Sequence, residues 1–97
     1  MQEKIKLLKA LGDETRIKIL QFLLDGEVCA CALVPSLGKA QPTVSAHLRI
    51  LENSGILESR RDGKNIWYKI KSKDAIKIMT LLSIPRLKID SKCVSSD

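Results

Sequence analysis

The sequence has few aromatic residues, a single histidine and no long hydrophobic run. No apolar stretch approaches the roughly 20 residues that cross a membrane, so we expect no membrane span. Charges are interleaved through the opening stretch MQEKIKLLKALG, and no small-residue cleavage site follows it, which argues against a signal peptide. We therefore expect a cytoplasmic protein.

Patterns typical of catalysis are also absent from the chain. There is no Gly-rich phosphate loop and no paired-acid motif, and one histidine offers little for acid–base chemistry. We therefore predict that the protein is not an enzyme and has no constitutive cofactor. The length of 97 residues suits one domain with one modest core. We assign that domain to residues 1–86 and expect a flexible tail at 87–97, which ends in small polar residues.

Four helical segments are expected in the first half of the chain. Apolar residues recur at helical spacing through residues 2–11, 14–25 and 42–53, and a shorter helix fits within 29–38. The segment 14–25 is apolar nearly all round, as expected of a central, buried helix. Gly12 and Gly26 follow the segments 2–11 and 14–25, and Gly38 closes the segment 29–38, which are common signals for a helix end.

The hydrophobic period changes from 3.6 to 2 after Gly55. Residues 56–71 therefore predict a β-hairpin, with Asp62-Gly63 as its turn signal. Ser72 is a suitable cap for a last helix, which Pro85 would stop. The order α-α-α-α-β-β-α predicts a mainly α fold with a β-hairpin wing, a winged helix-turn-helix.

The fourth helical segment has one apolar face and one small, polar face. If Val44, Leu48 and Leu51 face the core, the opposite side of the helix presents hydroxyl, amide and guanidinium groups to solvent. Groups of these kinds can hydrogen-bond to the base edges and phosphates of DNA. Donors also cluster around the hairpin turn, and the chain has 17 basic and 11 acidic residues, a net charge of +6. The residues predicted to contact double-stranded DNA are Gln41, Thr43, Ser45, Ala46, His47, Arg49, Arg60, Arg61, Lys64 and Asn65. A solvated helix face, or a winged helix that binds an acidic protein partner, is the alternative.

The stretches LKALGDETRIKILQFLL, VCACAL and QPTVSAHLRILENSGILESRRDGKNIWYKI resemble the ArsR/SmtB family of dimeric winged-helix repressors, over about residues 4–71. The resemblance implies a homodimer, built from the first and last helices, that blocks transcription at a palindromic operator until an inducer binds. The apolar last helix independently favours a partner, because so small a domain cannot bury all of its faces. The predicted interface residues are Ile5, Leu8, Ile76, Met79 and Leu82.

Three cysteines cannot all pair within one chain, and in a reducing cytosol we expect thiols, metal ligands or redox switches rather than structural disulfides. Cys29 and Cys31 stand just before the predicted helix-turn-helix. Residues two apart project ~200° from each other in a helix but share one side of an extended chain. Both sulfurs could therefore hold one soft ion only if this stretch is extended or its first helical turn is distorted.

The resemblance implies that Cys29 and Cys31 bind a metalloid or soft metal. Relatives of the best-known arsenite type have a third cysteine where this chain has Val34, the cadmium or lead types add cysteines before Cys29, and zinc types use histidines on the last helix. None of these is present here. We favour As(III) or Sb(III), with a soft divalent metal also possible, and the third ligand would be Cys93 or an exogenous thiol. Thiol oxidation, or simple core packing of the two cysteines, are the alternatives.

Overall fold

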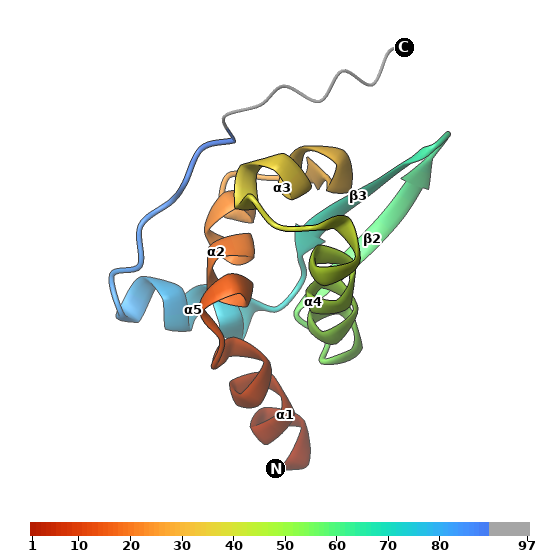
Figure 1. Ribbon diagram of the computed structural model, residues 1–97. Helices are drawn as coiled ribbons and strands as arrows, with labels where there is room; N and C mark the ends of the chain where they lie inside the picture. The colour runs from red at the N-terminus through yellow and green to blue at the C-terminus, as the bar shows by residue number, and fades with distance from the viewer. Residues whose placement is uncertain (90–97) are drawn as a thin grey trace.

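The computed structural model describes residues 1–89, and its five helices and its hairpin follow the predicted order, with one additional strand between the second and third helices (Figure 1). The winged helix-turn-helix prediction is confirmed. None of the helices within residues 1–89 combines the length and the hydropathy needed to span a membrane. The elements are α1 (Gln2–Leu11), α2 (Glu14–Leu23), β1 (Val28–Cys29), α3 (Ala30–Leu37), α4 (Gln41–Asn53), β2 (Leu57–Asp62), β3 (Asn65–Ile70) and α5 (Lys73–Leu81).

Short-range capping interactions begin and end several of these helices. The Asp13 carboxylate accepts a hydrogen bond from the Arg16 backbone N–H at 3.0 Å and so caps α2. Ser72 caps α5 in the same way, accepting from the Ala75 N–H at 3.1 Å. Gly38 ends α3 in the left-handed region, with φ of 67°, which glycine adopts without a steric cost.

The hairpin is part of a three-stranded sheet of order β1-β3-β2. Strands β2 and β3 pair from Leu57↔Ile70 to Asp62↔Asn65, and Gly63, with φ of 64°, lies in the turn. The third strand, β1, was not predicted. It pairs Val28 with Tyr68 and Cys29 with Trp67, so the segment ahead of α3 is hydrogen-bonded directly to the wing.

The core lies around α2, which Figure 1 shows in the middle of the helices. From α4, the predicted stripe of Val44, Leu48 and Leu51 is buried, which leaves the opposite face of α4 to solvent. From α5, Ala75 and Met79 face inward, and Met79 is only 1% exposed. The prediction that Met79 lies at a dimer interface therefore needs correction, because this side chain is already covered within the single chain.

After α5 the chain turns back along α2. The Leu87 N–H donates to the Gln21 carbonyl at 3.1 Å, and the Gln21 side chain donates to the Pro85 carbonyl at 2.9 Å. Leu87 and Ile89 are partly buried against the core. The first three residues of the predicted tail thus continue the domain, and Cys93 lies outside the described residues.

Candidate nucleic-acid interface and cysteine site

The face of α4 opposite the core carries the predicted DNA contacts. Gln41, Thr43, Ser45, Ala46 and Arg49 are all exposed, because the buried stripe at i, i+4 and i+7 turns them outward. Pro42 lies in the first turn, where a missing N–H costs no helical hydrogen bond. Short side chains at the start of this helix would allow close approach to a DNA groove.

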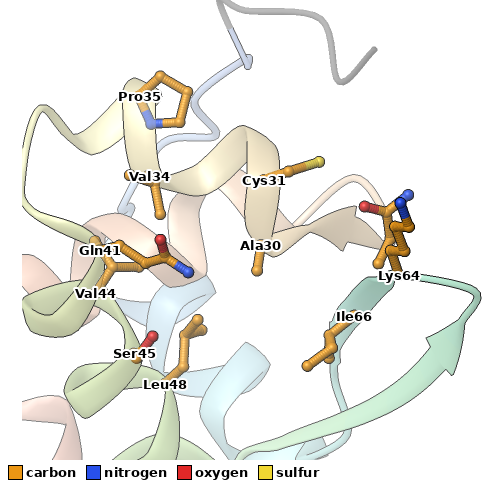
Figure 2. Close-up of a pocket in the computed structure, with 11 residues that line it drawn as sticks. Ala30, Cys31, Val34, Pro35, Gln41, Val44, Ser45, Leu48, Lys64 and Ile66 are labelled. Carbon is orange, nitrogen blue, oxygen red and sulfur yellow. The ribbon is translucent and has the colours of Figure 1, made fainter. Parts of the chain in front are cut away.

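A groove separates α3 and α4 from the wing, with a cavity volume of about 350 Å³ (Figure 2). Its apolar lining includes Val34, Leu48 and Ile66. Four predicted DNA contacts and one cysteine line the same groove, which we call the α3/α4/wing groove; these are Gln41, Ser45, Lys64, Asn65 and Cys31. The structure thus brings polar groups of α4 beside polar groups of the hairpin turn that lie 19 to 24 positions further along the sequence (64 − 45 = 19 and 65 − 41 = 24).

The two wing arginines face opposite sides of the hairpin. Arg61 pairs with Ile66, which lines the groove, and side chains directly opposite each other in a sheet share a face. Arg60 pairs with Trp67 on the other face, and its guanidinium lies 5.6 Å from the Trp67 ring centroid. The structure therefore places Arg61, but not Arg60, on the face of the hairpin that borders the α3/α4/wing groove.

Arg60 is also occupied by a carboxylate. Its Nε and Nη2 donate to the two oxygens of Glu27 at 2.8 and 2.9 Å. These hydrogen bonds hold the pKa of Glu27 below its usual value and raise the pKa of Arg60. Arg60 was predicted to contact DNA, and in this arrangement its positive charge is already compensated by Glu27.

His47 faces the start of α2 rather than open solvent. Its Nδ1 lies 3.3 Å from Arg16 Nη1 and 3.8 Å from Asp13 Oδ2. Arg16 in turn donates from Nε to the Ala10 carbonyl at 2.7 Å. The backbone N–H of Arg16 is the main cause that lowers the pKa of Asp13, and the charges of Arg16 and His47 act in the same direction. This cluster ties α4 to the start of α2.

Cys29 and Cys31 meet at the junction of β1 and α3. Cys29 is 1% exposed in the extended segment, whereas Cys31 is exposed in the first turn of α3. The two Cα atoms are 5.2 Å apart, within the usual range for a disulfide, and the sulfurs are bonded to each other. The strand-to-helix junction thus turns both side chains to one side, the geometry expected if the two sulfurs share one ion, and the bond between them is the oxidised form that a redox switch would use.

Within residues 1–89, no group of three or more His, Cys, Asp or Glu side chains could hold a metal ion. The two sulfurs are close enough to share a soft ion once their bond is reduced. In that state they would supply two thiolates, the donors that soft ions prefer. A three-coordinate ion would need a further ligand from outside the described residues.

The short helix α3, the exposed face of α4 and the basic wing together define a winged helix-turn-helix regulator that binds DNA. The family described as "Bacterial regulatory protein, arsR family" matches residues 13–59. An uncharacterized HTH-type transcriptional regulator of Methanocaldococcus jannaschii is 38% identical over 82 residues, which cover 80% of this chain and 92% of that protein. The chain belongs to the ArsR family. It is a transcriptional regulator and not an enzyme, as predicted.

Two further relatives are named for resistance to arsenicals or to cadmium. The arsenical resistance operon repressor of Escherichia coli is 43% identical over 67 residues, which cover 68% of this chain and 57% of that protein. A cadmium resistance transcriptional regulatory protein homolog of Staphylococcus aureus is 42% identical over 66 residues, which cover 67% of this chain and 54% of that protein. The chain thus spans little more than half the length of these two relatives.

A solved structure has the same fold. It is the solution NMR structure of the homodimeric winged helix-turn-helix DNA-binding domain of a possible ArsR-family transcriptional regulator from Mycobacterium bovis. It superposes with a TM-score of 0.78 at 30% identity and covers 86% of this chain and 77% of that chain.

Proposed function

We propose that this protein is a homodimeric repressor that leaves a palindromic operator when a soft ion binds Cys29 and Cys31, with As(III) or Sb(III) favoured. The observation that carries this proposal is the convergence of the two sulfurs at the junction between β1 and α3. The names of the arsenical and cadmium resistance relatives support an ion of this kind without selecting one. Binding would require reduction of the disulfide, since a thiolate is the ligand for such ions.

The position of the cysteines explains how an ion would disturb the reading surface. Cys29 in β1 pairs with Trp67 in the wing strand β3, and Cys31 lies in the first turn of α3, which packs beside α4. A change in the Cys29–Cys31 geometry would therefore reach both the wing and the helix-turn-helix. Two reading helices in a dimer must match half-sites about 34 Å apart, so a small displacement in each subunit would weaken the fit.

The homodimer is proposed to form through α1 and α5. Four of the five predicted interface side chains are exposed in the single chain: Ile5 is 45%, Leu8 57%, Ile76 40% and Leu82 63% exposed. Leu81, which was not among them, is 81% exposed and adds further apolar area at the end of α5. Apolar surface of this extent on a small domain usually meets a partner. The homodimeric state of the Mycobacterium bovis domain supports a second copy of this chain as that partner.

Thiol oxidation is a second candidate for the signal, and the bond between Cys29 and Cys31 favours it. In this alternative the disulfide and dithiol forms would differ in operator affinity, and no ion would be needed. The same pair would then act as a reversible two-electron switch.

One titration separates these functions. A duplex selected from a random pool by the reduced protein serves as the operator in a fluorescence anisotropy assay. We expect arsenite or antimonite to release it from wild type but not from Cys29→Ser or Cys31→Ser, since serine is a poor ligand for a soft ion. Cadmium, lead, zinc and peroxide complete the series. If peroxide releases the operator and none of the ions does, the result would favour the redox function. If both serine variants release the operator at the ion concentrations that act on the wild type, the result would refute the cysteine site.

A further inference from the structure

The two sulfurs of the Cys29–Cys31 disulfide differ in their access to solvent. Cys29 is 1% exposed in β1, whereas Cys31 is exposed and lines the α3/α4/wing groove. Figure 2 shows Cys31 projecting from α3 toward the side on which Lys64 and Ile66 lie. An incoming thiolate can therefore reach the Cys31 sulfur from the groove but not the Cys29 sulfur, and access decides which sulfur is attacked.

The buried sulfur is placed to act as the leaving group. Cys29 is the N-cap of α3, and its Sγ accepts a hydrogen bond from the Cys31 N–H at 3.1 Å. A helix N-terminus and its unpaired N–H groups stabilise a thiolate, and a more stable thiolate leaves faster. Attack on Cys31 would break the Cys29–Cys31 bond, place its electron pair on the Cys29 sulfur, and form a new bond between Cys31 and the attacking sulfur.

This exchange needs no further reactant. The attacking thiol loses its proton to solvent before it attacks, and one disulfide is exchanged for another without any net oxidation. The products are a mixed disulfide at Cys31 and a thiolate at Cys29 inside the fold.

The groove offers room and polarity for the group attached to such a thiol. Its volume of about 350 Å³ lies within the roughly 300–1,000 Å³ of small-molecule sites. The Lys64 ammonium can meet a carboxylate, while Gln41, Ser45 and Asn65 can hydrogen-bond to peptide groups. A small peptide thiol that carries carboxylates matches this lining better than a neutral thiol does.

We propose that Cys31 is a modification site for an anionic low-molecular-weight thiol, whose mixed disulfide occupies the α3/α4/wing groove and excludes DNA from it. The exclusion of DNA rests on the proposed function, because it requires Gln41, Ser45 and Lys64 to face the operator. The attached thiol would fill the groove, and its carboxylates would repel the phosphates of the DNA.

The modification is tested by intact mass and peptide mapping with glutathione as the probe. All variants carry Cys93→Ser, so that only Cys29 and Cys31 can react. The disulfide form of the otherwise wild-type protein is treated with reduced glutathione and quenched with acid, and we expect the transient adduct on Cys31, because the released Cys29 thiolate re-forms the disulfide. Cys29→Ser, which lacks the resolving thiolate, is treated with oxidised glutathione and should accumulate the same adduct. Cys31→Ser is the matched control and should be modified at least tenfold more slowly, because Cys29 is buried. Adduct on Cys29, or equal labelling of the two variants, would overturn the proposal.

The role of the groove has its own measurements. In the Cys29→Ser background, Lys64→Ala should slow the modification of Cys31 by oxidised glutathione about two- to fivefold, which is the effect of losing one exposed charge pair. The rate of modification by the neutral 2-hydroxyethyl disulfide should stay unchanged. The purified Cys29→Ser adduct should bind the selected operator at least tenfold more weakly than unmodified Cys29→Ser. An adduct that binds DNA equally well would refute the exclusion of DNA. If the unmodified protein binds no DNA, the proposed function fails while the mass measurements still decide the modification site.

Discussion

Met79 in α5 and Leu82 at the C-cap of that helix were predicted to share one interface, but their substitution should affect different properties of the protein. Met79 is 1% exposed and packs in the core, whereas Leu82 is 63% exposed at the end of the helix. Replacing a buried methionine by alanine leaves a cavity and typically costs about 2–5 kcal/mol. A domain of this size is stable by about 5–15 kcal/mol, so Met79→Ala should remove a large part of its free energy of unfolding.

Urea denaturation followed by circular dichroism measures this loss. For a slope of about 1.5 kcal/mol/M, a cost of about 3 kcal/mol lowers the midpoint by about 2 M. The measurement is made at one low protein concentration, so that any dimer contributes equally to wild type and variant. An unchanged midpoint for Met79→Ala would refute the placement of this side chain in the core.

Leu82→Asp should instead act on assembly. Burying an unpaired carboxylate at an apolar contact is costly, so we expect the dimer dissociation constant to rise at least tenfold in sedimentation velocity across a protein dilution series. Lys77→Asp is the matched control, because it places the same side chain at an exposed polar position of α5. If Leu82→Asp sediments as wild type at every concentration, α5 does not form the proposed interface.

Three further predictions concern the reading surface and its support. Thr43→Ala should reduce the preference for the selected operator over random DNA in competition anisotropy. Lys64→Ala should instead weaken binding to the operator and to random DNA alike, and should lower the salt slope by about one. The same loss of operator preference in both variants would contradict this division. Glu27→Gln removes the carboxylate that holds Arg60, so affinity for random DNA and its salt slope should both rise, and an unchanged slope would show that Arg60 lies out of reach of the phosphates. Asp13→Ala removes a helix cap at a cost of about 1 kcal/mol. Because the folded pKa of Asp13 is lowered, its ionic contribution is present above the unfolded pKa of about 3.9 and is lost as pH falls through the folded value. The difference in unfolding free energy between wild type and Asp13→Ala should therefore shrink below about pH 4, and a constant difference would contradict this origin.

Interactions between near neighbours made most of the fold predictable. Asp13 and Ser72 cap helices through backbone groups three residues away, and Gly38 ends a helix through its own left-handed conformation. The apolar stripe of α4 repeats every three to four residues, and the wing repeats every two. Each of these signals lies within a single element, so the sequence by itself determined the helices, the hairpin and the outward face of α4.

Contacts between elements decided the rest. Val28 and Cys29 form a strand only because β3 offers its edge, and two residues are too few to show a period. That docking also sets the junction at which Cys29 bonds to Cys31. Met79 faces inward because of how α5 docks on the core.

The same holds for the charges of the site. Arg60 binds a carboxylate 33 positions away, and His47 lies against Arg16, 31 positions away. The residue spacing within β2 or α4 contains no information about these partners, because the distance between them is set by the folding of the whole chain. The sequence therefore predicted which side chains are exposed on the reading helix and the wing, and only the tertiary structure decided which of their charges are already paired.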